Sequence, residues 1–220
     1  MTQAPRFLGS SIGKKVVMAV TGLILFGFVL GHMLGNLQVY LGAEALNHYG
    51  VLLRKLLHGA GLWVVRAVML TAVSLHIWAA TSLTLESRRA RPIGYEEQKW
   101  KESTYASRTM RWGGVIIFLF VIYHLLHFTT GTVHPNFIEG DIYRNFVTGF
   151  QSVPVSLFYI VAMVALGFHL RHGVWSMFQT LGVSHPRYIR IVHAASWIFA
   201  VLIVAGNISF PLAVLTGIVK

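Results

Sequence analysis

The residues of this sequence that could do chemistry are first of all its histidines, because imidazole can bind metal ions, relay protons and form hydrogen bonds. There are eleven in 220 residues. Four of them, His32, His76, His124 and His169, lie in long apolar stretches. Polar side chains at membrane depth are costly and tend to be functional, although a single one often only hydrogen-bonds a neighbouring helix. One histidine in each of four such stretches points to a shared site.

The elements that must position these histidines are membrane-spanning helices. Hydrophobic residues make up 55% of the chain and charged residues 11%, with a mean hydropathy of +0.63, which excludes a water-soluble globule. The charges leave five uncharged runs, each with room for the ~20 residues that cross a bilayer. We predict an all-α transmembrane fold, one domain over 1–220 and a five-helix bundle with spans at about 16–38, 62–84, 112–131, 154–177 and 191–218.

The basic residues indicate the orientation of these spans. With the N-terminus inside, thirteen of the 18 Lys and Arg residues fall on the inner side and five on the outer side, which fits the positive-inside rule. The net charge of +11 therefore reflects topology, and we expect no nucleic-acid partner. The polar stretch 86–111 is the expected main inner loop, with Pro92 ending the preceding helix. The sequence has no cysteine, so it cannot ligate an iron–sulfur cluster or attach a c-type haem.

Depth in the membrane sorts the four histidines into two layers. At ~1.5 Å per residue, His32 and His124 lie about 18–24 Å from the inner face, and His76 and His169 about 8–9 Å from it. We call His32 and His124 the outer pair, and His76 and His169 the inner pair. Imidazole is a standard axial ligand of haem iron, so the pattern predicts two stacked b haems enclosed by four helices. The intervals His32–His76 and His124–His169 are 44 and 45 residues, as expected for two similar hairpins with the fifth span outside.

Two further histidines leave alternatives open. His127 and His172 each follow a predicted ligand by one helical turn, and spacing cannot choose between the members of each couple. Depth favours His124 and His169, which leaves His127 and His172 to bind propionates or loop carbonyls. Arg66 and Arg111 are placed to pair with propionates, although contact with solvent or lipid phosphate explains them as well.

The sequence resembles the cytochrome b subunit of succinate:quinone oxidoreductases, in its single-polypeptide, two-haem b558 form. The resemblance covers the whole chain and depends on segments that are specific only together: Ser11–Lys15, Met18–Gly22, His32–Leu37, Gly42–Asn47, His76–Ile77, Ala90–Pro92, Ala106–Met110, Tyr123–Phe128, His169–Ser176 and Phe178–Gly182.

This resemblance implies five helices and two b haems, with His32 paired with His124 and His76 with His169. It implies a flavoprotein with covalent FAD and an iron–sulfur protein docked on the inner face, in the cytoplasmic membrane of a prokaryote. Electrons from succinate would pass to a quinone, menaquinone being expected, or in reverse during fumarate reduction. The subunit would anchor the succinate dehydrogenase or fumarate reductase complex and supply its quinone chemistry.

One departure concerns proton transfer. Some relatives carry a glutamate two residues before the inner ligand of the fourth span, where this chain has Gly167, and all seven acidic residues lie outside the uncharged cores. Glu44 and His48 on the outer loop are the nearest candidate proton donors to quinone, but they read equally well as solvated loop residues.

Two other functions are compatible with parts of the pattern. The haem b subunit of a hydrogenase or formate dehydrogenase would place its ligands on a different set of helices. A cofactor-free, histidine-lined proton-coupled transporter would need a water-filled path, and it gives no reason for histidines at matched depths.

Overall fold

The computed structural model describes residues 7–90, 105–183 and 185–220, and this part of the chain is helical with no strand. Five segments in it are long and apolar enough to cross a membrane. They are built on α1 (Ser11–Asn36), α3 (Ala60–Arg89), α4 (Tyr105–His124), α6 (Val153–Thr180) and α7 (Pro186–Leu215). The predicted all-α transmembrane class is confirmed.

Helix α1 begins before the first uncharged run, at a capping residue. Ser10 caps α1, because its hydroxyl accepts a hydrogen bond from the backbone N–H of Gly13 at 3.0 Å. Helix α1 thus begins five residues before the predicted span at about 16–38, whose bounds in the membrane stay a prediction. Pro154 lies in the first turn of α6, as predicted. At the other end of the second span, α3 stops at Arg89, while Pro92, expected to end it, lies outside the described residues.

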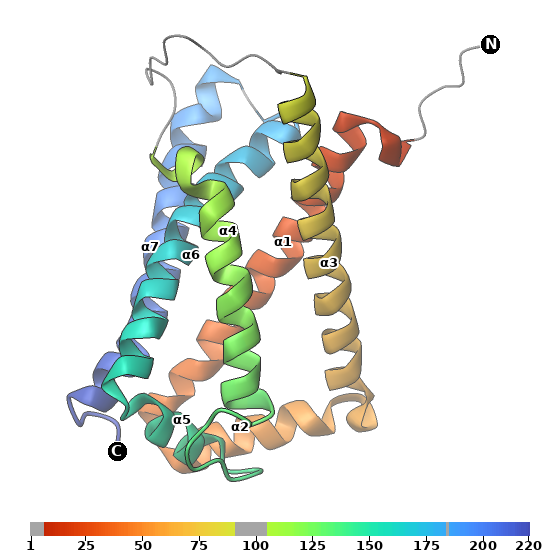
Figure 1. Ribbon diagram of the computed structural model, residues 1–220. Coiled ribbons are helices and arrows are strands. Elements are labelled where there is room, and N and C mark those ends of the chain that lie inside the picture. Colours follow the sequence, from red (N-terminus) through yellow and green to blue (C-terminus); the bar gives the residue numbers. More distant parts are fainter. Residues whose placement is uncertain (1–6, 91–104, 184) are drawn as a thin grey trace.

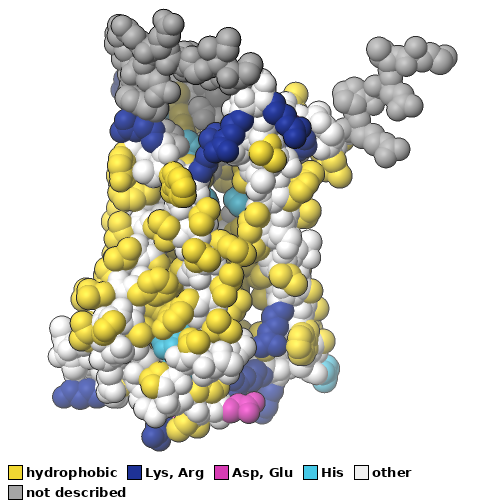
Figure 2. Space-filling model, in the orientation of Figure 1, with side chains coloured by type: hydrophobic (Ala, Val, Ile, Leu, Met, Phe, Trp, Pro, Cys, Tyr) yellow, Lys and Arg dark blue, Asp and Glu magenta, His cyan; other side chains and the backbone are white. Residues whose placement is uncertain are grey.

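The spanning helices stand side by side, with α1 packed on α3 and α6, and α4 packed on α6 (Figure 1). The fifth span, α7, packs on α6 and α1. Lys14 on α1 forms an ion pair with Glu86 on α3 near the N-terminal end of the bundle. Apolar side chains cover the middle of the molecule, and lysines and arginines gather toward its two ends (Figure 2). Trp63 and Leu70, for example, are 68% and 69% exposed, as expected for side chains that face lipid.

Two shorter helices, α2 (Ala43–Lys55) and α5 (Ile142–Phe150), lie across the end of the bundle opposite the N-terminus (Figure 1). Helix α2 contains Glu44 and His48 of the predicted outer loop, and α5 was not predicted. Its signal is Asp141, whose side chain caps the helix by accepting from the N–H of Arg144 at 3.1 Å. Asn47 ties α2 to α5, because its amide accepts from the N–H of Tyr143 at 2.9 Å and donates to Asp141.

Short helical turns connect these elements. They are η1 (Phe7–Gly9), η2 (Leu37–Leu41), η3 (Leu56–Gly59) and η4 (Leu125–Thr129). The last is a π turn, closed by a hydrogen bond from the N–H of Thr130 to the carbonyl of Leu125 at 2.9 Å. It follows His124 directly and contains His127, so it decides where these two side chains point.

Candidate functional site

Four histidines face one another as two pairs inside the bundle. In the outer pair, the ring centroids of His32 on α1 and His124 on α4 are 5.9 Å apart, with the planes nearly perpendicular at 87°. In the inner pair, His76 on α3 and His169 on α6 are 6.3 Å apart at 59°. The structure thus brings together the residues that the depth argument paired, one from each of four helices.

The two pairs lie at different levels of the bundle. Thr21 contacts His76 of the inner pair, and His32 of the outer pair follows it eleven residues later on α1. Tyr159 contacts His124 of the outer pair, and His169 of the inner pair follows it ten residues later on α6. At ~1.5 Å per residue, both helices give a separation of about 15–17 Å along their axes.

The inner pair has a defined hydrogen-bond polarity at His76. The hydroxyl of Thr21 donates to the carbonyl of Val17 at 2.7 Å, so its oxygen accepts from Nδ1–H of His76 at 3.1 Å. Nε2 of His76 is then unprotonated, which is the form that binds a metal. Nδ1 of His169 is buried and has no hydrogen-bond partner among the described residues.

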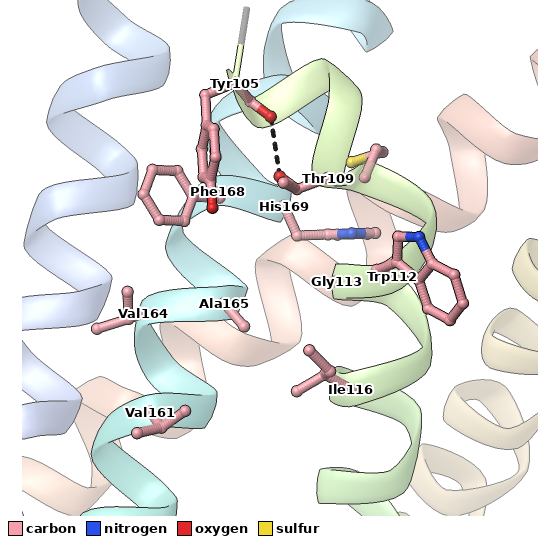
Figure 3. A pocket seen from close by; sticks show the side chains of 11 residues that line it. Tyr105, Thr109, Trp112, Gly113, Ile116, Val161, Val164, Ala165, Phe168 and His169 are labelled. Atoms are coloured by element: carbon pink, nitrogen blue, oxygen red, sulfur yellow. Dashed lines mark hydrogen bonds between the residues drawn. The ribbon is translucent and has the colours of Figure 1, made fainter.

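Glycines allow close approach to the inner pair. A Cβ on Gly22 would lie 3.4 Å from Cε1 of His76, and one on Gly114 would lie 3.8 Å from Cε1 of His169. A cavity of about 270 Å³ opens between α4 and α6 beside His169, with Gly113 and Trp112 on its α4 side and Ala165 and other residues on its α6 side (Figure 3). The inner pair therefore has open, mostly apolar space next to it.

In the outer pair, His124 belongs to a hydrogen-bonded aromatic cluster, while His32 is exposed. The hydroxyl of Tyr159 lies 3.3 Å from Nδ1 of His124 and 3.1 Å from Nδ1 of His127. Tyr159 is 6% exposed. On the other side of the pair, Nδ2 of Asn36 lies 3.2 Å from Nε2 of His32, a contact that Asn36 must release before this nitrogen can bind a metal.

The π turn separates His127 from His124. An i→i+5 turn holds more residues than an α turn. His127 is fully buried, shares the Tyr159 hydroxyl with His124 and stacks on His134 at 4.9 Å, whereas the ring that faces His32 is that of His124. His172 is half-buried and makes no ring contact with His76 in the described part of the chain. Spacing along a regular α-helix does not distinguish His127 from His124 or His172 from His169.

The residues present fit a metal ion between the rings of each pair. Imidazole nitrogens bind metals at about 2.0–2.1 Å, and with about 1 Å from ring centre to nitrogen on each side the two centroids come out about 6 Å apart. The observed separations are 5.9 and 6.3 Å. Together with the unpartnered Nδ1 of His169, these separations fit two pairs of histidines that would each hold one haem; that the iron lies there stays a prediction.

The remaining predicted site residues lie at the surface. Arg66 is exposed on α3, and its guanidinium lies over the ring of Trp63 at 4.8 Å. Arg111 is exposed on α4. Glu44 and His48 are exposed on α2 and form no hydrogen bond with any described residue. The structure places none of these four in contact with a histidine pair, so their roles stay predictions.

Comparison with known proteins identifies the family. The family "Succinate dehydrogenase/Fumarate reductase transmembrane subunit" matches residues 87–208, more than half of the chain. The chain belongs to this family. It is therefore a membrane-spanning subunit of the succinate dehydrogenase/fumarate reductase type, part of an enzyme complex that it anchors in the membrane. No curated protein and no solved structure gives a significant match.

The matched region holds one half of each histidine pair. Residues 87–208 of this transmembrane subunit include His124 and His169, whereas His32 and His76 precede them. His32 and His76, which face these two histidines, lie on α1 and α3 before the matched residues.

Proposed function

We propose that this chain is the di-haem cytochrome b anchor subunit of a succinate:quinone oxidoreductase, which passes electrons between an iron–sulfur partner and membrane quinone. The observation that carries the proposal is that the inner and outer pairs each consist of two facing histidines, at two levels of the bundle, with one histidine from each of four helices. Membership of the succinate dehydrogenase/fumarate reductase family supports the reaction class.

The chain's own residues would hold and orient the cofactors. His32 and His124 would bind the outer b haem through their imidazoles, and His76 and His169 the inner one. Bound there, the two haems would supply one-electron transfer across most of the membrane. Arg66 and Arg111 are the proposed propionate partners, although neither lies against a pair in the described structure.

The proposed function also implies an orientation in the membrane and a set of protein partners. We propose that the N-terminal end, with its basic residues, faces the cytoplasm of a prokaryote and docks the iron–sulfur protein and the FAD flavoprotein. Quinone, with menaquinone expected, would react at the outer side, where Glu44 and His48 of α2 are the proposed proton donors. The family match favours this proposal over a hydrogenase-type or formate dehydrogenase-type haem subunit and over a histidine-lined transporter.

The test is a haem-to-protein ratio on the purified membrane complex, with reduced-minus-oxidised spectra. We expect two b haems per chain, and loss of one haem in each of His32→Ala, His76→Ala, His124→Ala and His169→Ala. A colourless complex would remove the proposal and leave only a multi-pass subunit of the family. His127→Ala serves as the matched control, because it deletes an imidazole one turn from His124 and should retain both haems.

A further inference from the structure

Each histidine pair has one imidazole that is held by a hydroxyl from another helix. In the inner pair, Thr21 on α1 contacts Nδ1 of His76 on α3 at 3.1 Å. In the outer pair, Tyr159 on α6 contacts Nδ1 of His124 on α4 at 3.3 Å. Both hydroxyl residues are almost fully buried, with 4% and 6% exposure. Neither was singled out as a functional residue by its position in the sequence.

We propose that Thr21 and Tyr159 are positioning residues, each of which fixes the tautomer and orientation of one axial histidine and tunes the reduction potential of its own haem. The inference rests on the proposed function, because it takes the four histidines as iron ligands. An imidazole that donates its Nδ1–H to an acceptor keeps Nε2 free for the metal and becomes a more basic ligand. A more basic ligand favours ferric over ferrous iron, which lowers the potential.

At Thr21 the direction of the hydrogen bond follows from the contacts. The single hydroxyl proton goes to the carbonyl of Val17 at 2.7 Å, so the oxygen is left to accept from His76. Gly22, the next residue on α1, lies beside the same ring, where a Cβ would make ordinary van der Waals contact at 3.4 Å from Cε1 of His76. Thr21 thus provides the hydrogen-bond acceptor for the ring of His76, and Gly22 lies in contact with that ring.

At Tyr159 the phenol oxygen is shared by two histidines. If Nε2 of His124 binds iron, Nδ1 carries the proton and donates to Tyr159, whose own proton then goes to Nδ1 of His127 at 3.1 Å. Hydrogen bonds in such a chain polarise one another, so His127 makes Tyr159 a better acceptor. This gives the buried His127 a role that does not involve binding iron.

The experiment uses the complete membrane complex and measures the potentials of both haems by spectroscopic redox titration in Thr21→Val and Tyr159→Phe. Each change should cut the preference for ferric iron by up to about tenfold, which raises that haem's potential by up to about 59 mV for a one-electron couple. Thr21→Val should shift the inner haem alone and Tyr159→Phe the outer haem alone. Each variant is thereby the control for the other.

Two further variants separate positioning from packing. Thr21→Ser restores a hydroxyl on a smaller side chain and should return the inner haem toward its original potential. The ring centroids of Tyr123 and Tyr159 are 6.2 Å apart. The hydroxyl of Tyr123 forms no hydrogen bond within the described residues, so Tyr123→Phe should change neither haem potential. His127→Leu should shift the outer haem in the same direction as Tyr159→Phe but by less, and His127→Asn, which retains an acceptor, should shift it least.

The outcomes separate this inference from the proposed function. A wild-type complex without haem would remove both. Two haems in the wild type with potentials that do not move, or that move together in either variant, would overturn the inference and leave the proposed function standing. If Tyr159→Phe loses the outer haem outright, His127→Leu and His127→Asn test the proposed role of Tyr159 instead. Equal potentials of the outer haem in these two variants would contradict that role.

Discussion

The inner and outer histidine pairs have nearly the same ring separation, but their surroundings differ. In the inner pair, His169 borders a cavity between α4 and α6, and His76 does not line it. In the outer pair, the ring of His124 packs against Phe120, Phe128 and Tyr159 at 5.8–5.9 Å, whereas His32 is exposed.

This difference goes with the helices that lie across one end of the bundle and not across the described part of the other. Around the outer pair, α5 buries Phe146 and Phe150 against Phe128, and His134 in the preceding loop bonds to the carbonyl of Asn145 at 2.9 Å. Around the inner pair, no such helix lies across the described end of the bundle. The two facing histidine pairs thus differ mainly in one member each: His124 lies among aromatic side chains, and His169 borders apolar space.

The largest expected effect is loss of one particular haem. If the two pairs are independent sites, His32→Ala and His124→Ala remove the same spectral component, and His76→Ala and His169→Ala remove the other. Low-temperature difference spectra of the four variants measure this. Loss of both components from any single change would break the comparison by showing that the sites are not separate.

A smaller effect is expected at Gly149 in α5. A Cβ there would lie 2.9 Å from Cε1 of His127 and 3.0 Å from Cε1 of Phe128, so α5 must shift in Gly149→Ala, at a cost of about 1–3 kcal/mol. Thermal release of the outer haem, followed by absorbance, should begin at a lower temperature, while release of the inner haem changes little.

The matched control for Gly149 is Gly27 on α1. A Cβ at this position would meet nothing within 4 Å, and replacing glycine inside a helix favours the helix by roughly 0.5–1 kcal/mol. Gly27→Ala should therefore not weaken the outer site. If Gly149→Ala and Gly27→Ala lost the outer haem at the same temperature, the packing of α5 against Phe128 would have no specific role at the outer site.

The smallest effect is expected at Asn36. Its amide nitrogen lies 3.2 Å from Nε2 of His32 and competes with a metal for that atom. Removing one neutral hydrogen bond of about 0.5–1.5 kcal/mol in Asn36→Ala should strengthen outer haem binding by up to about tenfold. The rate of haem transfer to apomyoglobin measures this, with the inner haem as internal reference; faster loss of the outer haem would show that Asn36 instead supports the ligand.

The spans and the pairing were predictable because they depend on quantities that a sequence carries directly. Uncharged length fixes which segments can cross a membrane, and rise per residue fixes the depth of His32, His76, His124 and His169 along their helices. Those two regularities hold wherever the backbone is a regular α-helix, so they were sufficient to place the facing pairs.

What the sequence did not give depends on local departures from that regularity. The π turn at Leu125–Thr129 turns His127 into the cluster around His134, and no residue pattern in the segment announces it. Helix α5 was missed because residues 142–150 lie between the predicted third and fourth spans, in a stretch taken as outer loop, although Asp141 caps the helix. Thr21 and Tyr159 were missed because their partners come from other helices, which no spacing within one segment reveals.

Helices α1 and α6 each serve both levels, since α1 carries His32 for one and Thr21 for the other, and α6 carries His169 for one and Tyr159 for the other. A sliding or rotation of either helix would disturb both sites at once. A cofactor bound at one level would therefore also restrain the two helices at the other level, while a change of a single histidine would still remove one cofactor only.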